Sequence, residues 1–136
     1  MVSVSIEYKG GLRCEATHGP SGRTLETDAP VDNHGKGESF SPTDLATTAY
    51  GSCMATVMGI IAKQRELDLA GMRVELIKEM SSDAPRRIVR ITAEIRIPGE
   101  FSEDERTLLE DAALSCPVKL SVHPEIDQPV TFHWGK

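Results

Sequence analysis

The sequence has few aromatic residues, few cysteines and no excess of positive charge, and each shortage excludes a class of function. Aromatic side chains make up 4% of the 136 residues, so a surface that stacks nucleic-acid bases is not expected. The formal net charge of −6 argues against a nucleic acid or an anionic membrane as partner. The opening segment, MVSVSIEYKGG, lacks the basic and apolar regions of a secretory signal, which favours a cytoplasmic protein.

Cysteine chemistry is limited by number and spacing. The three cysteines, Cys14, Cys53 and Cys116, are odd in number and form no C-x-x-C pair, and the four histidines are scattered. A disulfide framework is therefore not expected, and neither a zinc or iron–sulfur site nor any other cofactor is predicted. Three separate thiols remain, and their surroundings decide whether they fill space or react.

Hydrophobic patterning predicts one α+β domain over residues 1–136, with mainly antiparallel sheets. The length is that of an ordinary single domain, and no repeat or linker interrupts it. Strands pair through short turns such as Lys9-Gly10-Gly11, and the helices are inserted singly between them. The expected strands are 2–8, 12–19, 23–30, 71–82, 86–98 and 129–134, and the expected helices are 42–67 and 103–114, with a short helix after Pro117.

The longest predicted helix carries a cysteine in an uncharged stretch. Ser41 suits the N-cap and Pro42 the first helical position, and Asp44 stands where its carboxylate completes a capping box. No charge occurs in residues 45–62, yet this stretch contains threonine, serine, glycine and tyrosine and is short for a membrane span. We therefore expect a buried core helix, covered nearly all round, with Cys53 near its middle.

Two interpretations of the cysteines stay open at this point. Free cysteine is among the most buried residue types, so each of the three can simply fill the core. Cys53 lies too far from the start of its helix to benefit from the helix dipole, so a reactive thiolate there needs a cation from elsewhere in the chain. Cys116 precedes Pro117, which fixes the local backbone, and Cys14 lies on the side of an alternating strand that is expected to face the core.

Two stretches resemble the signature segments of the OsmC/Ohr family, the osmotically inducible protein C and organic hydroperoxide resistance proteins. The first is SPTDLATTAYGSCMATVM, in which a proline opens a helix and a cysteine follows about eleven residues later, and the second is the distant SCPVK. The order of strands and helices is also similar to that family over nearly the whole chain. The resemblance implies an interwoven homodimer in which sheets of both subunits surround the central helices and the active sites lie at the subunit interface.

The resemblance also implies a thiol-dependent peroxidase that reduces organic hydroperoxides. Mapped onto this sequence, Cys53 is the thiolate that attacks the peroxide and Cys116 is the resolving thiol, and a dithiol reductant resets the pair. A dry pocket at the interface suits an alkyl hydroperoxide. Candidates to line that pocket are Phe40, Met54 and Met58, for which core packing is the competing interpretation.

The sequence departs from the family at the residues that activate the thiolate. Family peroxidases use an arginine from the N-terminal strands and a glutamate that usually follows the helix-opening proline directly. Here Thr43 holds the position of the glutamate and Asp44 comes next, while Glu38 lies on the preceding loop. Arg13 is the expected arginine. Other basic residues of the same region are Arg23 and Lys9.

These departures leave a second function open. A protein of the same fold can keep both cysteines as structural or redox-sensing groups and bind a small apolar ligand at the dimer interface. The retained cysteine pair favours the peroxidase, whereas the missing glutamate at Thr43 favours the ligand-binding protein. A disulfide between Cys53 and Cys116, formed on treatment with a hydroperoxide, discriminates between the two.

Overall fold

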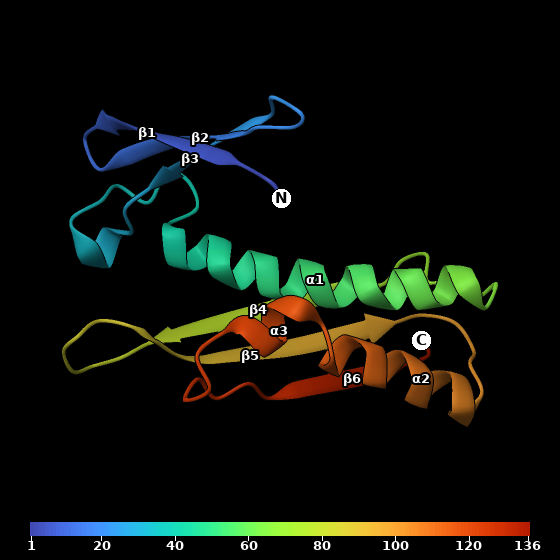
Figure 1. The fold of residues 1–136 in the computed structure, drawn as a ribbon. Helices are drawn as coiled ribbons and strands as arrows, with labels where there is room; N and C mark the ends of the chain where they lie inside the picture. The colour runs from blue at the N-terminus through green and yellow to red at the C-terminus, as the bar shows by residue number, and fades with distance from the viewer. The chain divides into compact units, whose positions relative to one another are not determined.

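A computed structural model describes all residues 1–136, which fall into two compact units. Unit 1 contains residues 1–46 and unit 2 contains residues 47–136, and helix α1 (Pro42–Gln64) begins in the first and continues into the second. Each unit has its own three-stranded sheet, drawn in blue for unit 1 and in green-yellow to red for unit 2 (Figure 1). The predicted α+β fold with mainly antiparallel sheets is confirmed, since three strand pairs are antiparallel and one is parallel.

The sheet of unit 1 is a meander of three short strands. β1 (Val4–Gly10), β2 (Arg13–His18) and β3 (Thr24–Asp28) pair antiparallel in that order. The tight turn between β1 and β2 requires left-handed backbone angles, φ 85° at Gly10 and 60° at Gly11, which glycine adopts without strain. A single 3-10 turn, η1 (Val31–Asn33), lies on the loop that leads from β3 to α1.

One face of this sheet is apolar and exposed, and we call it the meander face. The strand register places Ile6 beside Ala16 and Tyr8 beside Cys14, and it places Ala16 beside Leu25. Ile6 is 68% exposed and Tyr8 is 63% exposed. Cys14, which the sequence pattern directs toward a core, lies on this face and is half-buried. The meander face therefore has the apolar composition of a hydrophobic core, but its side chains remain exposed to solvent.

The sheet of unit 2 combines a hairpin with a strand from later in the chain. β4 (Arg73–Met80) and β5 (Ile88–Ile97) pair antiparallel, and β6 (Val130–Trp134) lies parallel to β5 on its other side. Between β5 and β6 the chain forms α2 (Glu103–Leu114) and α3 (Pro117–Ser121). This long crossover is what allows β6 to return in the parallel direction.

β5 supplies the centre of the core of unit 2. Its alternating side chains are at most 1% exposed, which confirms the period-two pattern of the sequence. They are Ile91, Ala93, Ile95 and Ile97. One side of α1 packs into the same core through Tyr50, Met54, Met58 and Ala62.

Gly51 lets α1 approach β4 closely. A Cβ atom at this position would lie 2.4 Å from Cδ1 of Leu76, which is closer than side-chain atoms pack. A glycine inside a helix costs about 1 kcal/mol relative to alanine, so it needs a packing reason to be there. Contact with the sheet supplies that reason at Gly51.

The other side of α1 is exposed, so the expectation of a helix covered nearly all round is not met within the single chain. By length and composition alone α1 could cross a membrane. Its buried side, however, packs in the core of unit 2, as the central helix of a globular domain does. The exposed side has no charged residue before Lys63 and includes Ala49, Ser52, Thr56, Gly59 and Ile60.

The element boundaries agree with the sequence patterns to within a few residues. α2 has the predicted bounds because the capping box between Ser102 and Glu105 forms with both of its hydrogen bonds. α1 ends at Gln64, three residues before the predicted end at Leu67. The chain leaves the helix there because Glu66 takes a left-handed φ of 56°.

Candidate functional site

Two thiols meet in the core of unit 2. Cys53 lies near the middle of α1 and is half-buried, whereas Cys116 lies between α2 and α3 and is fully buried. The Cys53 side chain lies close enough to Cys116 to act on the ionisation of its thiol, and both thiols are free rather than joined in a disulfide. The two cysteines that the sequence singled out, far apart along the chain, are therefore neighbours in space.

Local backbone rules explain the placement of Cys116. α2 ends at Leu114, and Cys116 takes the extended angles φ −65° and ψ 143° that the following proline favours. Pro117 then opens α3, and Sγ of Cys116 accepts a hydrogen bond of 3.3 Å from the backbone N–H of Lys119. The thiol thus caps α3 and at the same time contacts Cys53.

The surroundings of Cys116 act on its thiol in two directions. Burial raises its pKa, and the neighbouring Cys53 thiol adds to the rise. The backbone N–H and the side-chain charge of Lys119 act against that rise, because both stabilise a thiolate. The net direction is upward, so at neutral pH Cys116 is a thiol that needs help to become a nucleophile.

Two residues that the sequence analysis did not single out complete the surroundings of the pair. Tyr50 precedes Cys53 by one helical turn, is fully buried, and has a hydroxyl without a hydrogen-bond partner. Burial, with a further contribution from Cys116, raises the pKa of Tyr50 to about 12. Nζ of Lys119 lies 5.9 Å from the centroid of the Tyr50 ring and 2.9 Å from Oε1 of Gln128. The i, i+3 spacing of Tyr50 and Cys53, and a cation three residues after Cys116, are the sequence signals that could have found them.

In unit 1, Arg13 is held by two acids. Its guanidinium group forms a hydrogen-bonded ion pair with Glu38 and lies 3.7 Å from Oδ2 of Asp28. Asp28 is 1% exposed, and the same Oδ2 accepts the backbone N–H of Glu38 at 3.1 Å, while its Oδ1 has no partner. The buried carboxylate therefore ties both the arginine and the loop that carries Glu38 to the end of β3.

The other basic candidate of the first turn is engaged elsewhere. Lys9 pairs with Glu7 at 3.1 Å and with Glu15 at 3.9 Å. Arg23 stands at the start of β3, outside the acid pair that holds Arg13. Nowhere in the chain do three or more histidine, cysteine or acidic side chains gather as a metal site requires.

Asp44 has the capping role predicted for it. Its Oδ2 accepts the backbone N–H of Ser41 at 2.9 Å, and Oγ of Ser41 accepts the backbone N–H of Asp44 at 3.1 Å. The hydroxyl of Thr43 lies 3.1 Å from the same Ser41 hydroxyl. The residues at and beside the expected glutamate position therefore both contribute to the start of α1.

The three candidate pocket-lining residues have different surroundings. Met54 and Met58 are fully buried members of the core of unit 2. Phe40 is 53% exposed on the loop before α1, and its carbonyl accepts the backbone N–H of Asp28 at 3.1 Å. Core packing accounts for the two methionines, whereas the Phe40 side chain is open to a ligand.

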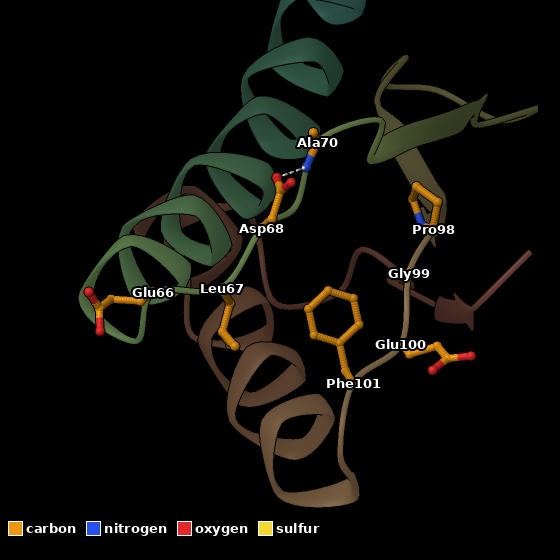
Figure 2. A pocket seen from close by; sticks show the side chains of 8 residues that line it. All are labelled: Glu66, Leu67, Asp68, Ala70, Pro98, Gly99, Glu100 and Phe101. Atoms are coloured by element: carbon orange, nitrogen blue, oxygen red, sulfur yellow. Dashed lines mark hydrogen bonds between the residues drawn. The ribbon is translucent and has the colours of Figure 1, made fainter.

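A hollow of about 420 Å³ lies where α1 ends and where β5 leads into α2 (Figure 2). Leu67 and Phe101 face each other across it, while the carboxylates of Glu66 and Glu100 point away from its centre. None of the cysteines, and none of the residues expected at the site, lines this hollow. It is therefore separate from the thiol pair.

Comparison with known proteins places these features in a family. Residues 35–129 match the family of OsmC-like proteins. A solved structure from Psychrobacter arcticus 273-4, named for an osmotic stress induced and detoxification response, is 44% identical, covers 98% of this chain and 96% of its own, and has a TM-score of 0.91. A search of curated protein sequences finds no match.

More distant structures share the fold. An organic hydroperoxide resistance protein OsmC from Legionella pneumophila is 13% identical, covers 98% of this chain and 96% of its own, and has a TM-score of 0.77. An organic hydroperoxide resistance protein from Elizabethkingia anophelis is 16% identical, covers 98% and 95%, and also has a TM-score of 0.77. The family match over residues 35–129 includes Cys53 and Cys116, and with the 44% identical structure it shows that the chain belongs to the OsmC-like protein family.

Proposed function

We propose that this protein is a cytoplasmic thiol-dependent peroxidase that reduces organic hydroperoxides through Cys53 and Cys116. The observation that carries the proposal is the contact between the two thiols, one from the middle of α1 and one from the junction of α2 and α3. Membership of a family with structural relatives named organic hydroperoxide resistance proteins supports the substrate class. A peroxidase of this kind requires no metal or organic cofactor.

The proposed chemistry needs two thiols and one reductant. The Cys53 thiolate attacks the O–O bond of the hydroperoxide, becomes a sulfenic acid, and releases the alcohol after the alkoxide takes up a proton. The Cys116 sulfur then displaces water from that sulfenic acid and forms a disulfide. An external dithiol reduces the disulfide and restores both thiols. The proximity of Cys53 and Cys116 in the core of unit 2 supports this pairing, because the second step requires the two sulfur atoms to meet.

Arg13 is the residue that we propose as the activating cation of Cys53. Its support is the ion pair with Glu38 and the buried Asp28 behind it, which together hold the guanidinium group in one orientation. Arginine and glutamate are the activating residues that the family resemblance implies, with Glu38 in place of the acid missing at Thr43. Asp44, already engaged in the cap of α1, is the weaker candidate for that acid.

We further propose that the active protein is a homodimer. Two surfaces support this, each considered within its own unit: the meander face and the uncharged exposed side of α1. A contiguous apolar face such as the meander face marks an interaction site in a soluble protein, and a helix side without charge suits close packing against a partner. A second copy of the chain is the partner implied by the resemblance, and of the three expected pocket residues Phe40 is proposed to border the substrate site, because Met54 and Met58 are fully buried in the core.

A non-catalytic protein that binds a small apolar ligand is the second candidate. The observation that favours it is the raised pKa of Cys116, which follows from burial and slows any reaction of that thiol. Thr43, which stands where the family has a glutamate, points in the same direction. In this protein the cysteines would be structural or redox-sensing groups.

Disulfide mapping separates the two functions. Reduced protein is treated with one equivalent of cumene hydroperoxide, and its mass and disulfide pattern are followed with time. The peroxidase rapidly loses two hydrogen atoms and links Cys53 to Cys116, whereas a ligand-binding protein keeps all of its thiols free.

Three variants complete this test. Cys53→Ser should abolish hydroperoxide consumption, because it removes the attacking sulfur. Cys116→Ser should allow one reaction and then accumulate sulfinic acid at Cys53, because no thiol resolves the sulfenic acid. Cys14→Ser is the matched control, since Cys14 lies in unit 1 outside the pair, and it should behave as the wild type. Equal and mild effects of all three substitutions would contradict the proposed mechanism.

A further inference from the structure

Lys119 has an environment that is unusual for lysine. Most lysine side chains extend into solvent, but this one is half-buried, with its amine 2.9 Å from the amide oxygen of Gln128. The amine also lies 5.9 Å from the centroid of the Tyr50 ring, within range of a cation–π interaction. Gln128 is neutral, so these contacts fix the position of the ammonium group without neutralising its charge.

The fixed charge lies on the short helix α3, which the less accessible thiol of the pair caps. Lys119 follows Cys116 by three residues, and its backbone N–H donates to Sγ at 3.3 Å. Cys116 and Tyr50 are both fully buried, so the charge acts in a medium that screens it much less than water does. Burial raises the pKa of the Cys116 thiol and Cys53 adds to the rise, whereas the backbone N–H of Lys119 and, to a smaller extent, its side-chain charge lower the pKa.

No other ionisable group that interacts with Cys116 can stabilise its thiolate by a positive charge. The ionisable side chains that interact electrostatically with it are Cys53 and Tyr50 from α1 and Lys119 from α3. Cys53 and Tyr50 become negative when they ionise, so both disfavour a thiolate at Cys116. Lys119 is the one positive charge of the group.

We propose that Lys119 is a positioning residue for the resolving step, in which its ammonium group favours ionisation of the buried Cys116 thiol. The inference rests on the proposed peroxidase function and extends it to the second thiol. In this step the Cys116 thiolate forms an S–S bond to Cys53 and the S–O bond of the sulfenic acid breaks. Cys116 is oxidised, Cys53 is reduced, and the hydroxide leaves as water with the proton that the Cys116 thiol gave up.

The first experiment measures the charge effect without any peroxide. In a Cys14→Ser/Cys53→Ser background, Cys116 is the only thiol, and its ionisation is followed by thiolate absorbance as the pH is raised. A parallel Cys116→Ser protein supplies the tyrosine background. Lys119→Gln should move the midpoint upward by about one pH unit, while Lys119→Arg, which keeps the charge, should leave it near its original value. Every variant retains the backbone N–H of residue 119, so only the side chain is tested.

Lys63→Gln is the matched control for this titration. Lys63 is exposed at the end of α1, and its substitution changes the net charge of the protein by the same amount. The Cys116 midpoint should not move in this variant. A midpoint that is the same in Lys119→Gln as in Lys63→Gln overturns the inference.

The second experiment measures the resolving step itself in the otherwise unchanged protein. A rise of one unit lowers the thiolate fraction about tenfold at neutral pH but raises its nucleophilicity about threefold, so Lys119→Gln should form the disulfide about threefold more slowly at pH 7. At a pH above both midpoints the order should reverse, with Lys119→Gln about threefold faster, because both thiols are then ionised and the thiolate of higher pKa is the stronger nucleophile. Equal slowing at every pH would show a merely structural role and overturn the inference.

The inference and the proposed function fail in different ways. If the wild-type thiols stay free after hydroperoxide treatment, the peroxidase proposal falls, and the resolving role falls with it. If the wild type forms the disulfide and Lys119→Gln forms it at the same rate at all pH values, the peroxidase proposal stands and the role of Lys119 is refuted.

Discussion

The hydroxyl of Tyr50 is buried beside the thiol pair. Nearly all buried polar groups in proteins have a hydrogen-bond partner, yet this one has none. The same burial raises the pKa of Tyr50 and of Cys116, because a low dielectric disfavours the charged form of either side chain. Burial of this kind protects a sulfenic acid from water but makes it harder to form a thiolate. A nearby cation would offset the second effect, because it stabilises the thiolate.

Tyr50→Phe should stabilise the protein and change how its stability depends on pH. Removing an unpaired buried hydroxyl should raise the free energy of unfolding by about 1 kcal/mol at pH 7. The raised pKa means that the unfolded chain ionises first above 10.0, so wild-type stability falls as the pH rises through about 12. That part of the fall should be absent in Tyr50→Phe. Urea unfolding at a series of pH values measures both effects, and a loss of stability at pH 7 would show that the hydroxyl has a partner in the assembled protein.

At the scale of elements, the approach of α1 to β4 depends on the absence of one side chain. Gly51→Ala gains about 1 kcal/mol of helix propensity, but its methyl group meets Leu76 and overpacking costs about 1–3 kcal/mol. The clash outweighs the propensity, so we expect a net loss of about 1 kcal/mol in the free energy of unfolding. Chemical denaturation measures this change.

A double-mutant cycle identifies the cause of that loss. Leu76→Ala alone should destabilise the protein by about 2–5 kcal/mol, because it removes packed methyl groups. In the Leu76→Ala background Gly51→Ala should no longer be destabilising, because the atoms that it meets are gone. Strictly additive effects would rule out the contact as the reason for glycine at this position.

The elements that the sequence predicts well are those with local causes. Residues next to one another in the chain form the capping box of α2 and produce the alternation of β5, so pattern alone locates both. Cys116 likewise owes its extended backbone to the proline that follows it. Two cysteines and the order of the elements were therefore enough to suggest where the site lies.

Features that depend on residues far apart in the chain could not be predicted from the sequence. The sequence offered both Asp44 and Glu38 as the acid for Arg13 and could not choose between them. Glu38 forms the pair because the loop after β3 folds back onto β2 and is tied there by Asp28. Tyr50 and Lys119 could not be linked to the thiol pair from the sequence, because they come together only where α3 lies near α1 in the fold. The exposed side of α1 was expected to be covered, because an uncharged pattern does not say whether the cover belongs to the same chain.

At the scale of the whole molecule, the uncovered apolar surfaces require an explanation. The meander face includes Ile6 and Tyr8, which are both more than half exposed. Alternate residues of the same strand, Ser5 and Glu7, are polar and point to the opposite face. One side of β1 has the apolar pattern of a core strand, yet the single chain leaves that side exposed. We therefore expect a second copy of the chain to cover it.

Ile6→Glu should therefore weaken the dimer by about tenfold or more in its dissociation constant, because it places a charge in an apolar interface. Ser5→Glu is the matched control, since it adds the same charge one residue away on the other face of β1. Analytical ultracentrifugation over a range of concentrations measures dissociation. Circular dichroism should show both variants folded, since the Ile6 side chain is 68% exposed in the single chain and supports little of its stability. A wild type that is a stable folded monomer at high dilution would refute the homodimer. If the wild type is a dimer but the two variants dissociate alike, the meander face is not its interface, and the exposed side of α1 is the remaining candidate.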